Sequence, residues 1–296
     1  MTQQDLFGGW WTQQKLEILS KYLKAYRRIF ESNQRARYFR VSYVDAFAGT
    51  GVIPRPALAG TLADFIPGIE KEEEEFRKGS ARRALEVDPP FQHYVFIEKD
   101  REKCGELIAL ASEFSMRDIR IINEDANTAL SRWCSEMEPR DRAVVFLDPF
   151  GASVEWNVIE AIAKTKAVDL WFLFPYGAVN RMLTSGRKPP PSWSERLTRV
   201  FGTGEWEEQF YSSTRYLSLL DPDQQVELVR KTAGKDEIIQ FFIDRLKTVF
   251  VDVATPGLLF NSRTLIFVLL FAAGNKAGAG AGIKIANHLL EGLTRV

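Results

Sequence analysis

The chain has 296 residues, of which 45% are hydrophobic and 26% charged, and its 39 basic and 39 acidic residues give no formal net charge. These values are typical of a folded globular protein and exclude a disordered chain. A neutral chain has no global positive field, so a long nucleic acid could bind only to a local basic patch.

Cysteine and histidine are scarce, which excludes several kinds of site. Cys104 and Cys134 are too few for a disulfide framework or a zinc cluster, and His93 and His288 have no partner at metal-binding or triad spacing. No signal peptide is apparent, and the most apolar run, Leu265–Ala273, is far shorter than the roughly 20 residues of a membrane span. We therefore expect a cytoplasmic protein with no membrane segment and no metal.

A helix is expected over residues 10–31, because apolar residues recur there at helical spacing. Five short apolar runs then alternate with helix-like stretches such as Arg101–Phe114 and Glu155–Thr165. This alternation predicts parallel strands. The expected strands are Val41–Phe47, Tyr94–Ile97, Ile119–Ile122, Ala143–Leu147 and Val168–Phe174.

Two further runs, Val249–Val253 and Leu265–Ala272, predict final strands that are antiparallel to each other. The whole chain, 1–296, is therefore expected to be one α/β domain with a doubly wound, mostly parallel, seven-stranded sheet. Residues 55–78 and 176–235 interrupt the alternation and are interpreted as insertions. The second is expected to be helical and is a candidate substrate-recognition region. The glycine run Gly278–Gly282 is expected to be a flexible lead into a terminal helix.

The first strand ends in Asp45-Ala46-Phe47-Ala48-Gly49-Thr50-Gly51. Glycines let the backbone approach a ligand, and an acidic residue at a strand end can hold an amine or a hydroxyl. The spacing is not the dinucleotide fingerprint G-x-G-x-x-G, which argues against an NAD-dependent oxidoreductase. A tight turn without a ligand remains the alternative.

Carboxylates also follow the next three strands, at Glu98, Asp125 and Asp148. Each one alone could be a helix cap. Together with Asp45 they would place four carboxylates at one edge of the sheet, where parallel strands end. This arrangement favours a polar ligand with several hydroxyls and amines.

This order of motifs resembles the core of the class I S-adenosylmethionine-dependent methyltransferases, over residues 40–175 and 249–273. The resemblance implies S-adenosylmethionine as cofactor. Asp45, Phe47, Gly49 and Gly51 would then border its methionine part, Glu98 would hold the ribose, and Asp125 with Ala126 would face the adenine.

More closely, the whole chain resembles the three-Cys-motif partner family. The resemblance rests on Tyr43–Gly49, Gly79-Ser80, Phe96-Ile97-Glu98, Phe146–Gly151 and Phe174–Gly177. That family is named for its co-occurrence with a cysteine-motif protein. The resemblance therefore implies such a protein as a partner and leaves open a non-catalytic, methyltransferase-fold binding role.

Asp148-Pro149-Phe150-Gly151 narrows the expected reaction. An exocyclic base amine is a poor nucleophile, because its lone pair is delocalised into the ring. A carboxylate and a backbone carbonyl can each accept one of its N–H groups, and they would offset the charge that develops on the nitrogen during methylation. Amino methyltransferases commonly carry Asn/Asp-Pro-Pro-aromatic here, and this sequence lacks the second proline. The same string is similar to that of tRNA guanine-N2 dimethyltransferases. We expect Asp148, Pro149 and Phe150 to be catalytic; the alternative is a helix cap and turn.

Basic residues interleave with Trp193 and Trp206 after the fifth strand. Arginine beside tryptophan suits phosphate neutralisation with base stacking, so we expect a nucleic acid to bind here. The alternative is the solvated face of an amphipathic helix over Trp193–Phe201. DNA, RNA and protein acceptors, and the oligomeric state, are left open by the sequence. The candidate substrate-binding residues are Arg181, Arg187, Lys188, Arg196 and Arg199.

Overall fold

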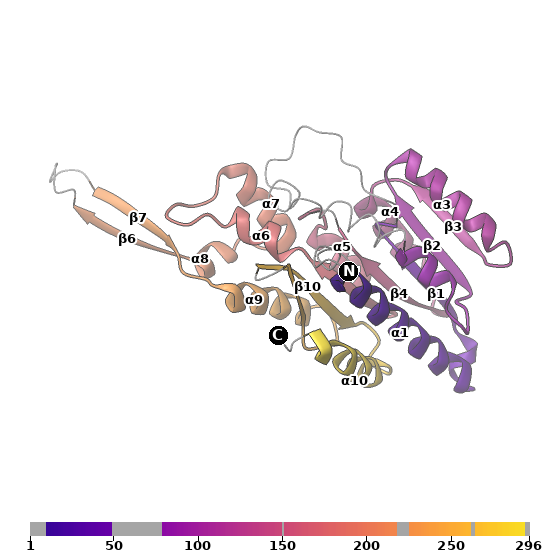
Figure 1. Cartoon of the computed structure of the whole chain (residues 1–296). Coiled ribbons are helices and arrows are strands. Elements are labelled where there is room, and N and C mark those ends of the chain that lie inside the picture. Colours follow the sequence, from indigo (N-terminus) through magenta and orange to yellow (C-terminus); the bar gives the residue numbers. More distant parts are fainter. Residues whose placement is uncertain (1–9, 49–78, 150, 218–224, 262–263, 294–296) are drawn as a thin grey trace, which may run out of the picture.

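In the computed structural model, the described residues are 10–48, 79–149, 151–217, 225–261 and 264–293. They form one large sheet covered by helices on both faces, and a separate two-stranded ribbon that projects from the body (Figure 1). The candidate residues Gly49, Gly51 and Phe150, and the expected insertion 55–78, lie outside the described residues.

The large sheet has the order β3-β2-β1-β4-β5-β10-β8, and β9 pairs with the free part of β10. The first five strands are parallel, whereas β10 is antiparallel to both β5 and β8. The seven strands of this order confirm the predicted doubly wound, mostly parallel sheet, and β9 adds an eighth strand that was not predicted. The strands are β1 Arg40–Asp45, β2 His93–Glu98, β3 Ile119–Asn123, β4 Asp141–Leu147, β5 Val168–Phe174, β8 Asp252–Val253, β9 Gly257–Asn261 and β10 Thr264–Ala273.

Helices cover both faces because the inner strands are apolar on both sides. In β5, Trp171 contacts Tyr22 on one face at 5.1 Å between ring centroids. Phe174 stacks on Phe242 on the other face at 4.4 Å. The first face carries α1 Trp10–Ser32, α3 Arg101–Glu113 and α10 Ala279–Leu290, and the second carries α4 Ala126–Ser135, α5 Trp156–Lys164 and α9 Lys235–Lys247.

The insertion after β5 is helical only as far as Phe210. It contains α6 Tyr176–Met182, α7 Pro191–Phe201 and α8 Trp206–Phe210, followed by the ribbon of β6 Tyr211–Leu217 and β7 Gln225–Lys231. The expectation of a helical segment over 176–235 therefore needs correction. Residues 212–214 are polar and exposed, so the first half of the ribbon lacks the apolar stripe of a packed helix.

Three smaller expectations also differ from the structure. The strand expected over Val249–Val253 is reduced to Asp252–Val253, and β9 was not expected. The glycine run from Gly278 is not a flexible lead, since α10 begins at Ala279 within it. In the described part of the chain, no helix is long and apolar enough to cross a membrane.

Candidate active site

The site candidates gather where the strand order reverses, between β1 and β4. Asp45, the last residue of β1, pairs in register with Phe146 of the adjacent strand β4. Asp148 comes two residues after Phe146, just past the end of β4. Ligands of doubly wound sheets bind at this crevice, outside the carboxyl ends of the strands. The structure thus brings Asp45 and Asp148 to the same edge, as the sequence predicts.

Asp45 is fully buried, and donors from Tyr43, Phe47 and Ser80 hold it within the described part of the chain. Its Oδ2 accepts hydrogen bonds from the Ser80 hydroxyl at 2.9 Å and from the Tyr43 hydroxyl at 3.4 Å. Its Oδ1 accepts one from the Phe47 backbone N–H at 3.2 Å. Ser80 comes from the helical residues 79–85. This carboxylate therefore fixes the first residues of the turn that leads toward Gly49.

Asp148 is also buried, with only 1% of its surface exposed, and Pro149 after it is buried. The Tyr43 hydroxyl lies near both carboxylates: burial, then Asp45 and Asp148, raise its pKa well above the ordinary value. The cap alternative for Asp148 is wrong, because α5 begins only at Trp156 and Glu155 occupies its N-cap.

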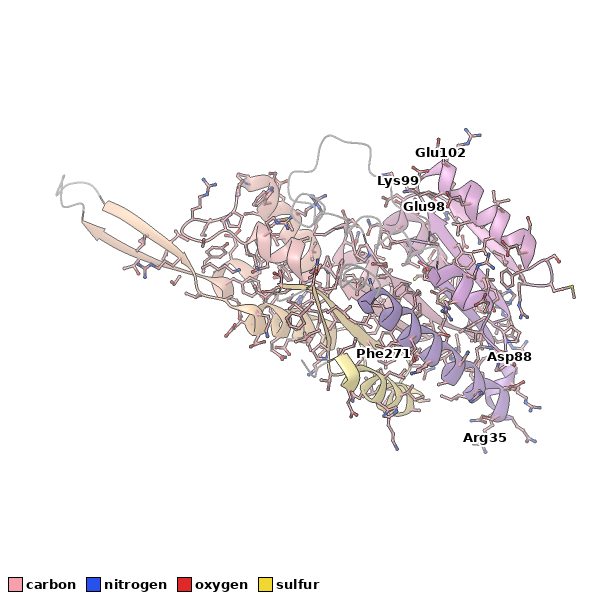
Figure 2. The ribbon with its side chains drawn as sticks, viewed as in Figure 1. Arg35, Asp88, Glu98, Lys99, Glu102 and Phe271 are labelled. Carbon is pink, nitrogen blue, oxygen red and sulfur yellow. The ribbon has the colours of Figure 1, made fainter. Side chains whose placement is uncertain are left out.

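Glu98 is the last residue of β2 and Asp125 follows β3 at the same edge of the sheet, and both are half-buried. Figure 2 labels Glu98 there, beside Lys99. One oxygen of Glu98 accepts the Asp100 N–H at 2.7 Å. Asp125 caps α4 by accepting the Asn127 N–H at 3.0 Å, and Ala126 begins that helix. The capping role considered for Asp125 is therefore real, and its second oxygen lies 3.7 Å from Lys99 Nζ.

Asn127 connects the two halves of this edge, and the sequence analysis missed it. Its Nδ2 donates to the Ser153 carbonyl at 3.1 Å, and its Oδ1 accepts the Glu155 N–H at 3.1 Å. One side chain at the start of α4 thus holds the loop that follows Asp148. An asparagine in a helix start has no distinguishing sequence signal, because it suits that position without any further partner.

Lys15 is a second residue that the sequence analysis missed. Only 2% of its surface is exposed, and its Nζ lies 5.1 Å from the ring centroid of Phe267. Phe267 precedes Val268, which pairs with Phe174 at the end of β5. A buried cation therefore lies at the same edge as the buried carboxylates. A signal existed: Lys15 lies four residues before Leu19, on the apolar stripe of α1.

The five basic candidates do not form one free cationic surface. Lys188 pairs with Glu207 at 3.1 Å, and Arg199 Nε lies 3.7 Å from Glu155. Arg196 is half-buried, and burial followed by the nearby Arg199 lowers its pKa. Arg181 is half-buried on α6, whereas Arg187 is exposed in the loop before α7.

Neither tryptophan of this region is an open stacking platform. Trp206 is fully buried, and its indole N–H donates to Thr198 at 3.1 Å. Trp193 is half-buried and packs against the core. The expectation that Trp206 stacks on a base is therefore wrong: helix α7 buries the ring within the insertion.

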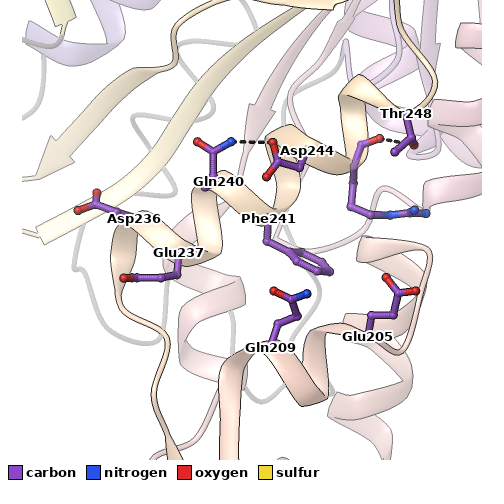
Figure 3. Close-up of a pocket in the computed structure, with 9 residues that line it drawn as sticks. Glu205, Gln209, Asp236, Glu237, Gln240, Phe241, Asp244 and Thr248 are labelled. Carbon is purple, nitrogen blue, oxygen red and sulfur yellow. Dashed lines mark hydrogen bonds between the residues drawn. The ribbon is translucent and has the colours of Figure 1, made fainter.

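A wide hollow of about 670 Å³ opens between α8 and α9 (Figure 3). Four carboxylates line it, and Gln240 donates to Asp244 at 2.7 Å. Its arginine, Arg245, donates to the carbonyls of Phe201 and Gly202. An acidic hollow repels phosphate, so it does not suit a nucleic acid. The carboxylates belong to Glu205, Asp236, Glu237 and Asp244.

No family model matches the sequence, and no curated protein matches it. Among solved structures, protein LPL1258 from Legionella pneumophila str. Philadelphia 1, with the family model DUF519, is 12% identical over 97% of this chain and 92% of its own, with a TM-score of 0.49. An S-adenosylmethionine-dependent methyltransferase from Clostridium acetobutylicum ATCC 824 is 10% identical over 88% and 92%, with a TM-score of 0.36.

An rRNA methylase from Streptococcus thermophilus is 11% identical over 66% of this chain and 88% of its own, with a TM-score of 0.28. The fold itself follows from the strand order and from the single antiparallel strand, β10, inserted between β5 and β8. The chain has a methyltransferase-like fold. With this fold, the edge that carries Asp45, Glu98, Asp125 and Asp148 is the one where a ligand is expected.

Proposed function

We propose that this protein is an S-adenosylmethionine-dependent methyltransferase that acts on an exocyclic amine of a nucleic-acid base. One observation carries the proposal. Two buried carboxylates, Asp45 and Asp148, lie at the ends of adjacent strands at the point where the strand order reverses. Buried carboxylates at a strand edge are expected to serve a ligand or a reacting group.

The donors and acceptors at this edge fit the cofactor. Glu98 and Asp125 are half-buried carboxylates, which suit the ribose hydroxyls and the adenine amine, with Ala126 against the adenine ring. Asp45, held by Ser80, would set the course of the turn through Phe47 along the methionine part. When bound, the cofactor supplies a methyl group made electrophilic by its sulfonium centre.

The acceptor side of the proposal rests on Asp148 and Pro149. Proline has no N–H, so its carbonyl and the preceding carboxylate are the groups that can accept both N–H bonds of an incoming amine. Burial strengthens these hydrogen bonds, because the surrounding dielectric is low. Asp148 thereby offsets the positive charge that develops on the nitrogen during transfer. Phe150 is proposed to stack on the base.

The proposed partner is a nucleic acid that lies along the insertion and reaches this edge of the sheet. Arg187 is exposed beside α7, and Arg199 joins α7 to Glu155 in the loop after Asp148. A strand bound to these cations would pass close to that loop. The motifs shared with the three-Cys-motif partner family support, in addition, an association with a cysteine-motif protein.

Two substitutions test cofactor binding and transfer separately. Asp148→Asn keeps the shape but removes the charge, so turnover of a methyl acceptor should fall by about 10²–10³ while affinity for S-adenosylhomocysteine is unchanged. Glu98→Ala should weaken that affinity by about 1.5–3 kcal/mol, the value of a hydrogen bond to a charged group. Calorimetry and a methyl-transfer assay on both variants provide the readouts.

Each outcome has a distinct meaning. A wild-type protein that does not bind S-adenosylhomocysteine would refute the cofactor. Wild-type turnover in Asp148→Asn would refute the proposed role of that carboxylate. A wild type that binds the cofactor and methylates no nucleic acid would instead favour the non-catalytic binding role.

A further inference from the structure

A second cavity lies at the opposite end of the sheet from the candidate active site. Its volume is about 280 Å³, and it lies between α1, α10 and the first residues of β4 and β5. Figure 2 shows this separation, with Glu98 at one end of the sheet and Arg35, which lines the cavity, near the other. The seven residues of β5 span roughly 20 Å between the two ends.

The floor of this cavity carries a carboxylate. Asp169, the second residue of β5, is half-buried and lines the cavity. Its Oδ2 accepts the Tyr22 hydroxyl at 3.0 Å, and its Oδ1 accepts the Gly274 N–H at 3.3 Å. A carboxylate oxygen has two lone pairs, so each oxygen keeps one for a donor that enters the cavity.

The walls are aromatic and the mouth is cationic. Tyr26 and Phe30 lie 4.9 Å apart between ring centroids, and the guanidinium of Arg142 lies 3.9 Å from the centroid of Phe39. All four line the cavity, together with the exposed Arg35. Within the described ranges, neither arginine forms an ion pair with a carboxylate. Arg142 Nη1 already donates to the carbonyls of Pro139 at 3.0 Å and Asp141 at 2.6 Å, so Arg35 and the remaining nitrogens of Arg142 are the groups left for an anionic group at the mouth.

We propose that this cavity binds a nucleoside monophosphate unit, either free or at the end of a strand. The base would donate its N–H groups to Asp169, its ring would lie against the aromatic walls, and the phosphate would meet Arg35 and Arg142. A neutral base suits these walls better than an alkylammonium, whose full charge would lose more hydration on entry.

Size supports a single nucleotide as the ligand. The cavity is close to the lower limit of about 300 Å³ for small-molecule sites, which leaves no room for a dinucleotide. The proposal is independent of methyl transfer, because the lining shares no residue with the candidate active site.

Binding of the four ribonucleoside 5′-monophosphates, measured by calorimetry against inorganic phosphate, tests the proposal. Ala281 is exposed and lines the cavity, so Ala281→Trp should fill it and weaken the preferred monophosphate by about tenfold or more, or 1.4 kcal/mol. His288→Trp is the matched control, at an exposed position of α10 that does not line the cavity, and should bind as the wild type does. Thermal unfolding verifies that both variants fold.

Two further variants test which side chains bind the phosphate and the base. Arg35→Ala should weaken the monophosphate but not the corresponding nucleoside, and Asp169→Asn should change the order of preference among the bases. A short oligonucleotide that competes with the monophosphate would assign the site to a strand end, and one that does not would assign it to the free nucleotide. Three results would overturn the proposal: the monophosphates bind no better than inorganic phosphate, they bind equally well to Ala281→Trp, or S-adenosylhomocysteine displaces them.

Discussion

Asp169→Asn should make the protein more stable at neutral pH but not at pH 3.5. Burial raises the pKa of Asp169 from 3.8 to about 6, against the smaller opposing effects of its bonds from Tyr22 and Gly274. The folded protein thus binds this proton more tightly than the unfolded chain does. The free energy of unfolding therefore falls as the pH rises from about 4 to about 6, and the loss is complete above that window.

The size of the loss follows from the shift. At 1.36 kcal/mol per pKa unit, a rise from 3.8 to about 6 corresponds to at most about 3 kcal/mol, since the cavity admits water to the carboxylate. Asparagine carries no such charge. It also keeps both bonds, because its oxygen can accept from Gly274 while its amide donates to the Tyr22 oxygen.

Urea unfolding of the wild type and of Asp169→Asn at pH 3.5, 5 and 7.5 provides the test. The difference between the two proteins cancels the titration of all other groups. Asp236→Asn removes a carboxylate that is 84% exposed and serves as the control for charge alone. A difference between Asp169→Asn and the wild type that stays constant across this pH range would refute the reasoning.

Two more predictions concern the insertion. Gly202→Ala should destabilise the protein far more than Gly186→Ala: both glycines have positive φ, but a Cβ at Gly202 would lie 2.1 Å from Trp156, whereas none lies within 4 Å at Gly186. We expect about 1–2 kcal/mol at Gly186 from the backbone alone, and more than twice that at Gly202 in chemical unfolding; equal losses would contradict the packing argument. Changing Arg187, Lys188, Arg196 and Arg199 together to Glu should abolish salt-sensitive oligonucleotide binding in fluorescence anisotropy. Because Lys188 and Arg199 are already paired with carboxylates, Arg187→Glu alone should account for more of the loss than Lys188→Glu.

The sheet could be predicted because its strands are buried on both faces. Val41–Phe47 and Val168–Phe174 appear as continuous apolar runs, and alternation with helices fixes their direction. β9 and the ribbon were missed for the opposite reason. Gly257–Asn261 pairs along only one side, and residues 212–214 are polar and exposed, so neither has a pattern that separates a strand from a loop.

The site was predictable only where residues follow strands. Asp45 and Asp148 are found by their place after apolar runs, which is a local property. Lys15 and Asn127 reach the edge through helices whose position depends on packing across the whole domain. The cavity that contains Asp169 is built from four segments far apart in the chain, so no local pattern could reveal it.

The two hydrogen bonds made by Asn127 have a consequence for how the insertion acts on the site. The loop after Asp148 is anchored through Ser153 and Glu155 to α4, which packs against the sheet, and α7 of the insertion reaches the same loop through Arg199. An exchange of residues 176–235 for another segment would remove the Arg199 contact but leave the Asn127 anchor in place. The loop is therefore held from two sides, and a change in the insertion that breaks the Arg199 contact would leave it tied to α4 through Asn127.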